Sequence, residues 1–140
     1  MEEDLEGKAR ELIEEDLYAA HLGAKLLDIR PGWAKVGLKL SEDHINFLGM
    51  VHGGVIFSLA DVAFGAAANS FGTRAMALTV GIDFLAAAEL DDELTAEVEL
   101  MTRAGKMGYY RMVVMDSSDN IIARCHGWAY HTNKPLREDG

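Results

Sequence analysis

The sequence predicts an α+β fold in which a curved antiparallel sheet wraps around one long central helix. Residues 53–73 carry a single formal charge, so this stretch is apolar on nearly every side and typical of a buried helix. Two strand-like runs precede it and four follow it, and their short, turn-rich connections favour antiparallel pairing. Because one apolar helix needs a sheet to cover it, the two observations together favour this architecture.

The composition is that of one ordinary globular domain spanning residues 1–140, with 49% hydrophobic and 26% charged residues. The formal net charge of −10 disfavours a nucleic-acid partner, because phosphate binding needs a basic surface. The first residues are acidic where a signal peptide would be positive. The single cysteine, Cys125, can form no internal disulfide. We therefore expect a cytoplasmic protein.

The first 20 residues are expected to form an amphipathic surface helix, over residues 4–20, whose apolar residues recur at helical spacing. These residues are Leu5, Ala9, Leu12, Ile13 and Leu17. Pro31-Gly32 then predicts a turn between strands at 24–30 and 33–40. The second of these strands alternates apolar and polar residues, which is the period of a half-buried strand.

The central helix is expected over residues 53–72. A membrane span is the weaker interpretation, because it would place Asp61 near the bilayer centre at a cost of about 2.5–3.5 kcal/mol. Turn-rich segments divide the rest of the chain into strands. These strands are expected at 76–85, 94–102, 109–116 and 121–131, with residues 132–140 as a tail.

Asp61 requires an explanation, because a carboxylate in an apolar helix is costly unless it is paired, hydrogen-bonded or used in chemistry. Its neighbours three or four residues away include no cation. They are Phe57, Ser58, Phe64 and Gly65. Two interpretations stay open on this pattern: a structural aspartate satisfied by Ser58, a backbone amide or a distant arginine, or a carboxylate that faces a ligand.

The beginning of the same helix, His52-Gly53-Gly54, is a second candidate feature. The two glycines let a ligand approach the backbone closely. The first N–H groups of a helix lack partners within it and attract negative charge, so they can stabilise an oxyanion. The alternative is that the glycines merely permit a tight turn into the helix.

The spacing of these two features predicts a dimer. Gly53 and Asp61 are eight residues apart, or roughly 12 Å along a straight helix. A reacting carbonyl must lie about 3 Å from both its amide donor and its attacking group. One chain therefore cannot supply both groups to one substrate. Two antiparallel helices across a twofold axis could do so, and would give two equivalent sites.

With these residues identified, the chain resembles the hotdog-fold thioesterases of the phenylacetate-degradation (PaaI-type) group. The resemblance covers roughly residues 20–132. It is carried by His44-Ile45-Asn46-Phe47-Leu48-Gly49-Met50-Val51-His52-Gly53-Gly54, by Phe57-Ser58-Leu59-Ala60-Asp61 and by Ile82-Asp83-Phe84-Leu85.

The resemblance implies a hotdog fold and hydrolysis of an acyl-CoA thioester to a free acid and CoA, with no metal or prosthetic group. Asp61 would be the nucleophile or the general base that activates water. The Gly53 amide would polarise the thioester carbonyl, while Asn46 and His52 would position the thioester or the water. The resemblance also implies homotetramers built as pairs of homodimers.

Further residues are candidates for substrate binding. Met50, Phe57 and Phe64 would line the acyl pocket, which suits aryl-acetyl and medium acyl groups equally. Some relatives orient the water with a serine or threonine, and Thr79 is the nearest candidate. Other contacts would come from Gly54 and, for the CoA phosphates, from Arg74 or Arg111 or from the hairpin residues Arg103 and Lys106. Arg103 and Lys106 could equally be solvated charges at a hairpin tip. Ala86-Ala87 replaces the Arg-Pro of many relatives, which removes one basic contact.

Two other functions stay open. The first is a non-catalytic protein of the same fold that binds acyl-CoA or another small ligand, because a fold does not fix a function. The second is a dehydratase, which would usually want a histidine beside the acidic residue. The five histidines include no HExxH pattern, so no metal site is expected.

Overall fold

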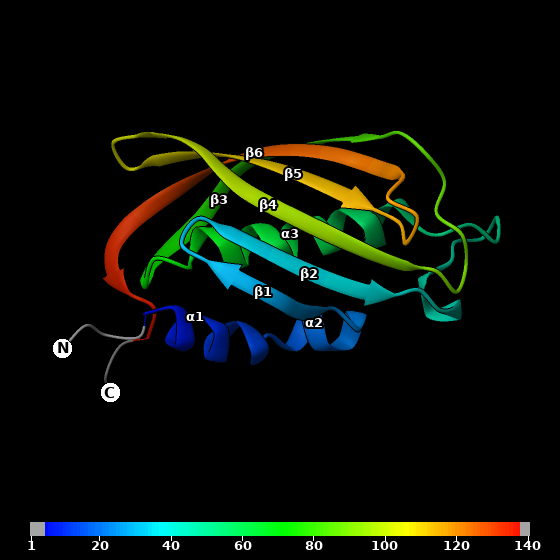
Figure 1. The fold of residues 1–140 in the computed structure, drawn as a ribbon, viewed down its shortest axis with the longest axis horizontal. Helices are drawn as coiled ribbons and strands as arrows, with labels where there is room; N and C mark the ends of the chain where they lie inside the picture. The colour runs from blue at the N-terminus through cyan, green and yellow to red at the C-terminus, as the bar shows by residue number, and fades with distance from the viewer. Residues whose placement is uncertain (1–4, 138–140) are drawn as a thin grey trace.

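A six-stranded antiparallel sheet curves around one long helix in the computed structural model, which describes residues 5–137 (Figure 1). The strand order is β1-β2-β4-β5-β6-β3, and every neighbouring pair is antiparallel. The strands are β1 (Lys25–Arg30), β2 (Trp33–Lys39), β3 (Thr73–Phe84), β4 (Glu93–Ala104), β5 (Met107–Met115) and β6 (Ile121–Pro135). The predicted α+β architecture is confirmed.

The central helix, α3 (Gly53–Ala68), places its apolar side against the sheet. Its buried side chains include Ile56, Leu59 and Ala63. The predicted end at residue 72 is wrong because Asn69 ends the helix. The Asn69 Nδ2 donates to the Gly65 carbonyl at 2.8 Å, and its Oδ1 accepts from the Ala75 amide at 2.9 Å. Between residues 5 and 137, no helix has the length and hydrophobicity needed to cross a membrane.

The N-terminal segment forms two helices rather than the single helix predicted over residues 4–20. They are α1 (Leu5–Glu14) and α2 (Leu17–Leu22). Asp16 is extended and caps α2, accepting a hydrogen bond from the Ala19 amide at 3.0 Å, which is a common way to begin a helix. The break turns Leu17 outward, where it is 86% exposed instead of lying on the buried face.

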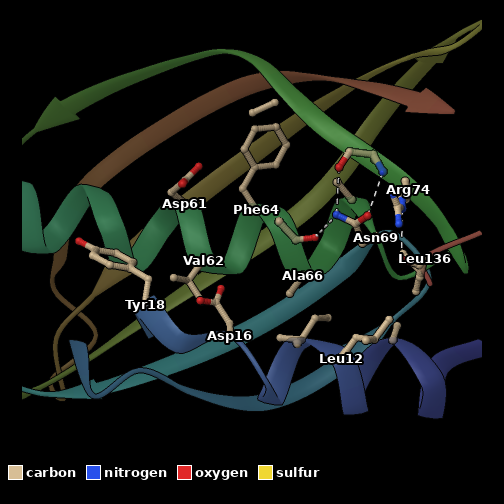
Figure 2. A pocket seen from close by; sticks show the side chains of 16 residues that line it. Leu12, Asp16, Tyr18, Asp61, Val62, Phe64, Ala66, Asn69, Arg74 and Leu136 are labelled. Carbon is tan, nitrogen blue, oxygen red and sulfur yellow. Dashed lines mark hydrogen bonds between the residues drawn. The ribbon is translucent and has the colours of Figure 1, made fainter. Parts of the chain in front are cut away.

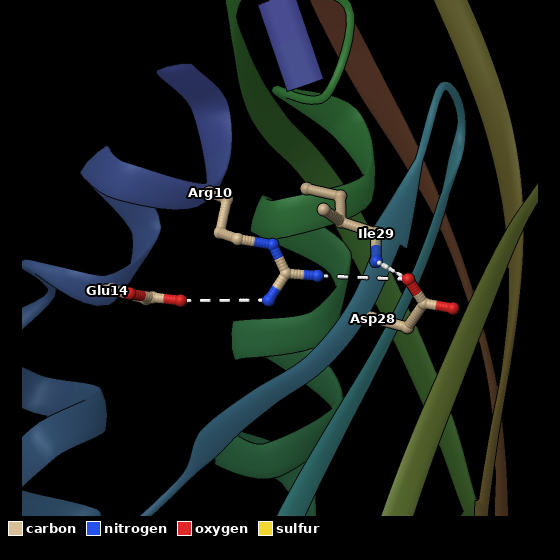
Figure 3. A network of polar contacts seen from close by, with 4 residues as sticks. All are labelled: Arg10, Glu14, Asp28 and Ile29. Atoms are coloured by element: carbon tan, nitrogen blue, oxygen red, sulfur yellow. Dashed lines mark hydrogen bonds and ion pairs between the residues drawn. The ribbon is translucent and has the colours of Figure 1, made fainter. Parts of the chain in front are cut away.

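An ion-pair network fastens α1 to the sheet (Figure 3). The Arg10 guanidinium lies 3.7 Å from the Glu14 carboxylate and 3.8 Å from that of Asp28 in β1. Asp28 also accepts a hydrogen bond from the Ile29 amide at 2.8 Å. Exposed ion pairs contribute only about 0–1 kcal/mol each, so this network orients α1 more than it stabilises it.

The strands differ from prediction mainly at their ends. Residues 132–135, predicted as part of the tail, continue β6 and pair with the beginning of β3. This pairing starts β3 at Thr73, three residues before its predicted start at 76. Residues 138–140 lie outside the described part of the chain. The strand β3 is at an edge of the sheet, with β6 as its neighbour.

A buried polar pair lies in the core between α3 and the sheet. Tyr110 is fully buried, and its hydroxyl is 2.9 Å from Nε2 of His131. Burial raises the pKa of Tyr110 and lowers the pKa of His131. Both groups are therefore neutral near pH 7, and the hydroxyl and the ring nitrogen share one hydrogen bond. The Phe64 ring packs against Tyr110, with centroids 5.2 Å apart.

We predict that Tyr110→Phe lowers the free energy of unfolding by about 1–3 kcal/mol, because it leaves a buried nitrogen of His131 without its hydrogen-bond partner. Urea unfolding would measure this change. Tyr109→Phe is the matched control, since the Tyr109 hydroxyl has no hydrogen-bond partner among residues 5–137. Equal losses in the two variants would contradict the assignment.

Candidate active site

Asp61 lies in the middle of α3 and opens onto a cavity of about 490 Å³ (Figure 2). The cavity lies between the N-terminal helices on one side and β3 on the other. Figure 2 shows Asp61 and Phe64 projecting from the side of α3 nearer β3, while Leu12, Asp16 and Tyr18 approach from the N-terminal helices. The carboxylate therefore faces open space beside an apolar wall.

The described part of the chain offers Asp61 no hydrogen-bond or ion-pair partner. Ser58, the neighbour that could have satisfied it, bonds instead to the Tyr18 hydroxyl at 2.8 Å. Burial among apolar groups raises the pKa of Asp61, and the negative charge of Asp16 raises it further. A carboxylate with a raised pKa is a stronger base than an ordinary aspartate, which suits general-base work.

The N-terminus of α3 supplies a backbone donor. His52 is the N-cap, and its Nδ1 accepts a hydrogen bond from the Gly54 amide at 2.9 Å. The His52 carbonyl accepts from the Val55 amide at 3.0 Å. The Gly53 amide has no hydrogen-bond partner within residues 5–137. It is thus a free donor at the positive end of the helix dipole.

Gly53 opens onto a second cavity, of about 630 Å³. Met50 lines it, together with Ala86 and Ala87, the two residues that replace the Arg-Pro of many relatives. The residues that line this cavity and those that line the Asp61 cavity do not overlap. One chain therefore keeps the free amide and the carboxylate apart, as the spacing along the helix predicts.

Asn46 organises the loop that leads into α3. Its Oδ1 accepts hydrogen bonds from the amides of Leu48 and Met50, at 2.9 and 3.1 Å. Its backbone amide donates to the Met50 carbonyl at 2.7 Å. The side-chain oxygen is thus occupied in holding the loop, and its Nδ2 donor is the group left for other contacts.

The remaining predicted residues are not gathered at one place. Phe64 lines the Asp61 cavity, although it is only 1% exposed and belongs mainly to the core. Phe57 and Thr79 line neither of these two cavities, and the Gly54 amide is engaged by His52. Arg103 and Lys106 lie at the hairpin between β4 and β5, and line neither cavity.

Two residues that the sequence analysis did not assign to the site, Asp16 and Tyr18, line the cavity with Asp61. A continuous helix over residues 4–20 left them without a role. The available signal was Asp16 itself, because aspartate is a preferred N-cap residue and marks a possible helix start. Their contact with α3 is tertiary, so no local pattern predicts it.

The family model of the Thioesterase superfamily matches residues 48–123, which contain Gly53, Asp61 and most of the sheet. The chain belongs to this superfamily. It is a thioester hydrolase of the PaaI type, and the resemblance seen in the sequence is confirmed.

Individual relatives agree with this assignment. Acyl-coenzyme A thioesterase PaaI of Escherichia coli is 32% identical over 119 residues, which cover 85% of each chain. A protein of Archaeoglobus fulgidus that is named as an esterase is 38% identical to this chain over 113 residues. The match covers 81% of this chain and 73% of that protein. The structure of the E. coli PaaI protein from the phenylacetic acid degradation operon superposes with a TM-score of 0.87 at 29% identity, covering 94% and 99% of the two chains. The hotdog fold is thereby confirmed.

We predict that Asp61→Asn raises the melting temperature at pH 7. A raised pKa in the folded chain means that the ionised carboxylate opposes folding above its usual pKa of 3.8. Thermal scans should show a gain that shrinks as the pH falls and vanishes below about pH 4, where Asp61 is protonated in both states. Asp83→Asn, outside the cavity, controls for net charge. An unchanged or lower melting temperature at pH 7 would contradict the prediction.

Proposed function

We propose that the protein hydrolyses acyl-CoA thioesters, with aryl-acetyl or medium acyl groups, to a free acid and CoA. The observation that carries the proposal is the pairing, on one helix, of a carboxylate without a partner at Asp61 and a free amide at Gly53. The name of the E. coli relative, an acyl-coenzyme A thioesterase, supports CoA as the thiol.

The chemistry follows from these two groups. The Gly53 amide donates to the thioester oxygen and stabilises the negative charge that develops there. Asp61 either takes a proton from a water that attacks the carbonyl carbon or attacks that carbon itself. The carbon–sulfur bond then breaks, and the CoA thiolate leaves and takes up a proton. Attack by water gives the free acid directly, whereas attack by Asp61 gives a mixed anhydride that a water then hydrolyses, which releases the acid and regenerates the carboxylate. In this scheme Asn46 and His52 position the thioester or the water, and Thr79 helps to orient the water.

Each site would combine groups from two chains, with Gly53 of one chain facing Asp61 of its partner. The edge strand β3 supports such a homodimer. Among residues 5–137 it has no neighbouring strand on one side, and it carries Met76, Leu78 and Phe84, which are 56%, 51% and 53% exposed. A long apolar edge invites pairing with another strand. Two such dimers would form the proposed homotetramer.

The CoA part of the substrate needs a binding surface of its own. The chain is acidic overall, so CoA phosphates need a locally basic surface, for which Arg103 and Lys106 are candidates. The proposal includes no metal, prosthetic group or nucleic acid, and places the enzyme in the cytoplasm. The alternative is a protein of the same fold that binds acyl-CoA without hydrolysing it.

We predict that the wild type releases free thiol from at least one acyl-CoA in a panel of aromatic and aliphatic thioesters. Asp61→Asn should lower kcat by 10²-fold or more, because the variant loses the base or nucleophile. CoA binding and oligomeric state should persist. Tight binding without turnover by the wild type would favour the binding protein, and equal rates would mean that Asp61 is structural.

The role of the Gly53 amide can be tested by Gly53→Pro, which removes only this N–H group from the backbone. Proline is favoured at the first position of a helix, and His52 already has the extended φ of −66° and ψ of 133° that a following proline requires. We expect kcat to fall by roughly 10²–10³-fold. Gly53→Ala retains the N–H and is the control, since an added Cβ meets only the Phe84 ring at 3.4 Å. A similar loss in both variants would contradict the role.

Mixed dimers would test whether the site spans two chains. When Asp61→Asn and Gly53→Pro chains are refolded together, each mixed dimer has one site with both groups intact. Random pairing should then restore about a quarter of the wild-type activity. If one chain supplied both groups, mixing would restore none.

A further inference from the structure

The cavity at Asp61 has the size and lining of a pocket for an apolar group. Its volume of about 490 Å³ lies within the usual range of small-ligand sites, roughly 300–1,000 Å³. Most of its lining is aliphatic or aromatic, including Leu12, Ile13, Val62 and Phe64. A thioester whose carbonyl lies at Asp61 can place its acyl group directly into this space.

Gly65 lies one helical turn beyond Asp61 and lines the same cavity. A glycine inside a helix costs roughly 0.5–1 kcal/mol relative to alanine. No packing within the described chain explains that cost, because a Cβ added at Gly65 would meet no atom within 4 Å. Gly127 is different, because there a Cβ would lie 2.8 Å from the Phe64 ring. The space above Gly65 is therefore free for a group from outside the chain.

Tyr18 forms the opposite wall of this space. Its hydroxyl is hydrogen-bonded to Ser58 at 2.8 Å, which ties α2 to the turn of α3 that precedes Asp61. The tyrosine is 58% exposed, so this bond, rather than core packing, holds the ring at the cavity. Ser58, Asp61 and Gly65 thus follow one another along the face of α3 that Tyr18 approaches.

We propose that the acyl group of the substrate lies over Gly65 and against Tyr18, and that the missing side chain at Gly65 sets the largest acyl group accepted. The inference rests on the proposed function and makes it more specific. The preferred substrates are then uncharged acyl groups of the bulk of phenylacetyl or octanoyl, rather than acetyl. The N-terminal helices contribute to this selectivity because they carry Tyr18.

The test compares kcat/KM for acetyl-CoA, octanoyl-CoA and phenylacetyl-CoA in wild type, Gly65→Ala and Gly65→Val. Filling the space should raise the ratio of kcat/KM for acetyl-CoA to kcat/KM for phenylacetyl-CoA. We expect a rise of about tenfold or more in Gly65→Val and a smaller rise in Gly65→Ala. Tyr18→Phe removes the hydrogen bond to Ser58 that holds the ring at the cavity, so it should change the same ratio of kcat/KM values. Gly65→Ala should also raise the melting temperature, since alanine favours the helix, and this separates selectivity from misfolding.

Ala20→Val is the matched control, because it adds bulk to an exposed position of α2 outside this cavity. An unchanged ratio in both Gly65 variants would overturn this inference while leaving the thioesterase proposal intact. Equal losses on all three substrates, together with dissociation on size-exclusion chromatography, would also overturn it, because Gly65 would then contact the partner helix. A wild type without turnover on any acyl-CoA would overturn the proposed function and this inference with it.

Discussion

The half-burial of α3 is the constraint on which the rest of the structure depends. The sheet covers the side of the helix that carries Ile56, Leu59 and Ala63, and the hydrophobic effect fixes the helix there. The opposite side, with Asp61 and Gly65, remains open. A helix enclosed on every side would leave its carboxylate no access to a substrate. The same burial that stabilises the fold therefore also holds Asp61 and the Gly53 amide in place.

The open side carries its own energetic cost. An unpartnered carboxylate beside apolar groups and near a second acidic residue has a raised pKa, so its charge is unfavourable in the folded chain. The Gly53 amide likewise has no partner within residues 5–137. A substrate that contacts Asp61 would explain the cost of its charge, since functional sites commonly depart from the choices that favour stability. The rigidity of one helix keeps Asp61 and the Gly53 amide apart, which is why the proposed chemistry combines groups from two chains.

The sequence predicted what periodicity and charge can predict. The lone charge in residues 53–73 identified α3 and Asp61. Alternation in residues 33–40 and turn-rich separators elsewhere located the strands, although their ends moved where pairing partners extended them, as in β6. The single N-terminal helix failed because helical spacing cannot show a break that an aspartate cap creates. Asn69 ended α3 through a bond to Ala75, a residue of the next strand. Tyr18 reached the site through a contact forty positions away, which no local pattern contains.

Two parts of the chain line the Asp61 cavity: α3 and β3 form its floor, and the N-terminal segment with Tyr18 forms its wall. The floor belongs to the segment matched by the superfamily model, residues 48–123, where changes disturb the sheet. Tyr18 lies on α2, before the first strand. The core holds this helix through buried Ala19 and Leu22, but the exposed Tyr18 ring is held at the cavity by its hydroxyl contact with Ser58. A change at Tyr18 therefore alters the shape of the cavity without altering Asp61 or Gly53. Protein engineers can therefore reshape the cavity from its N-terminal side while leaving the sequence of α3 unchanged.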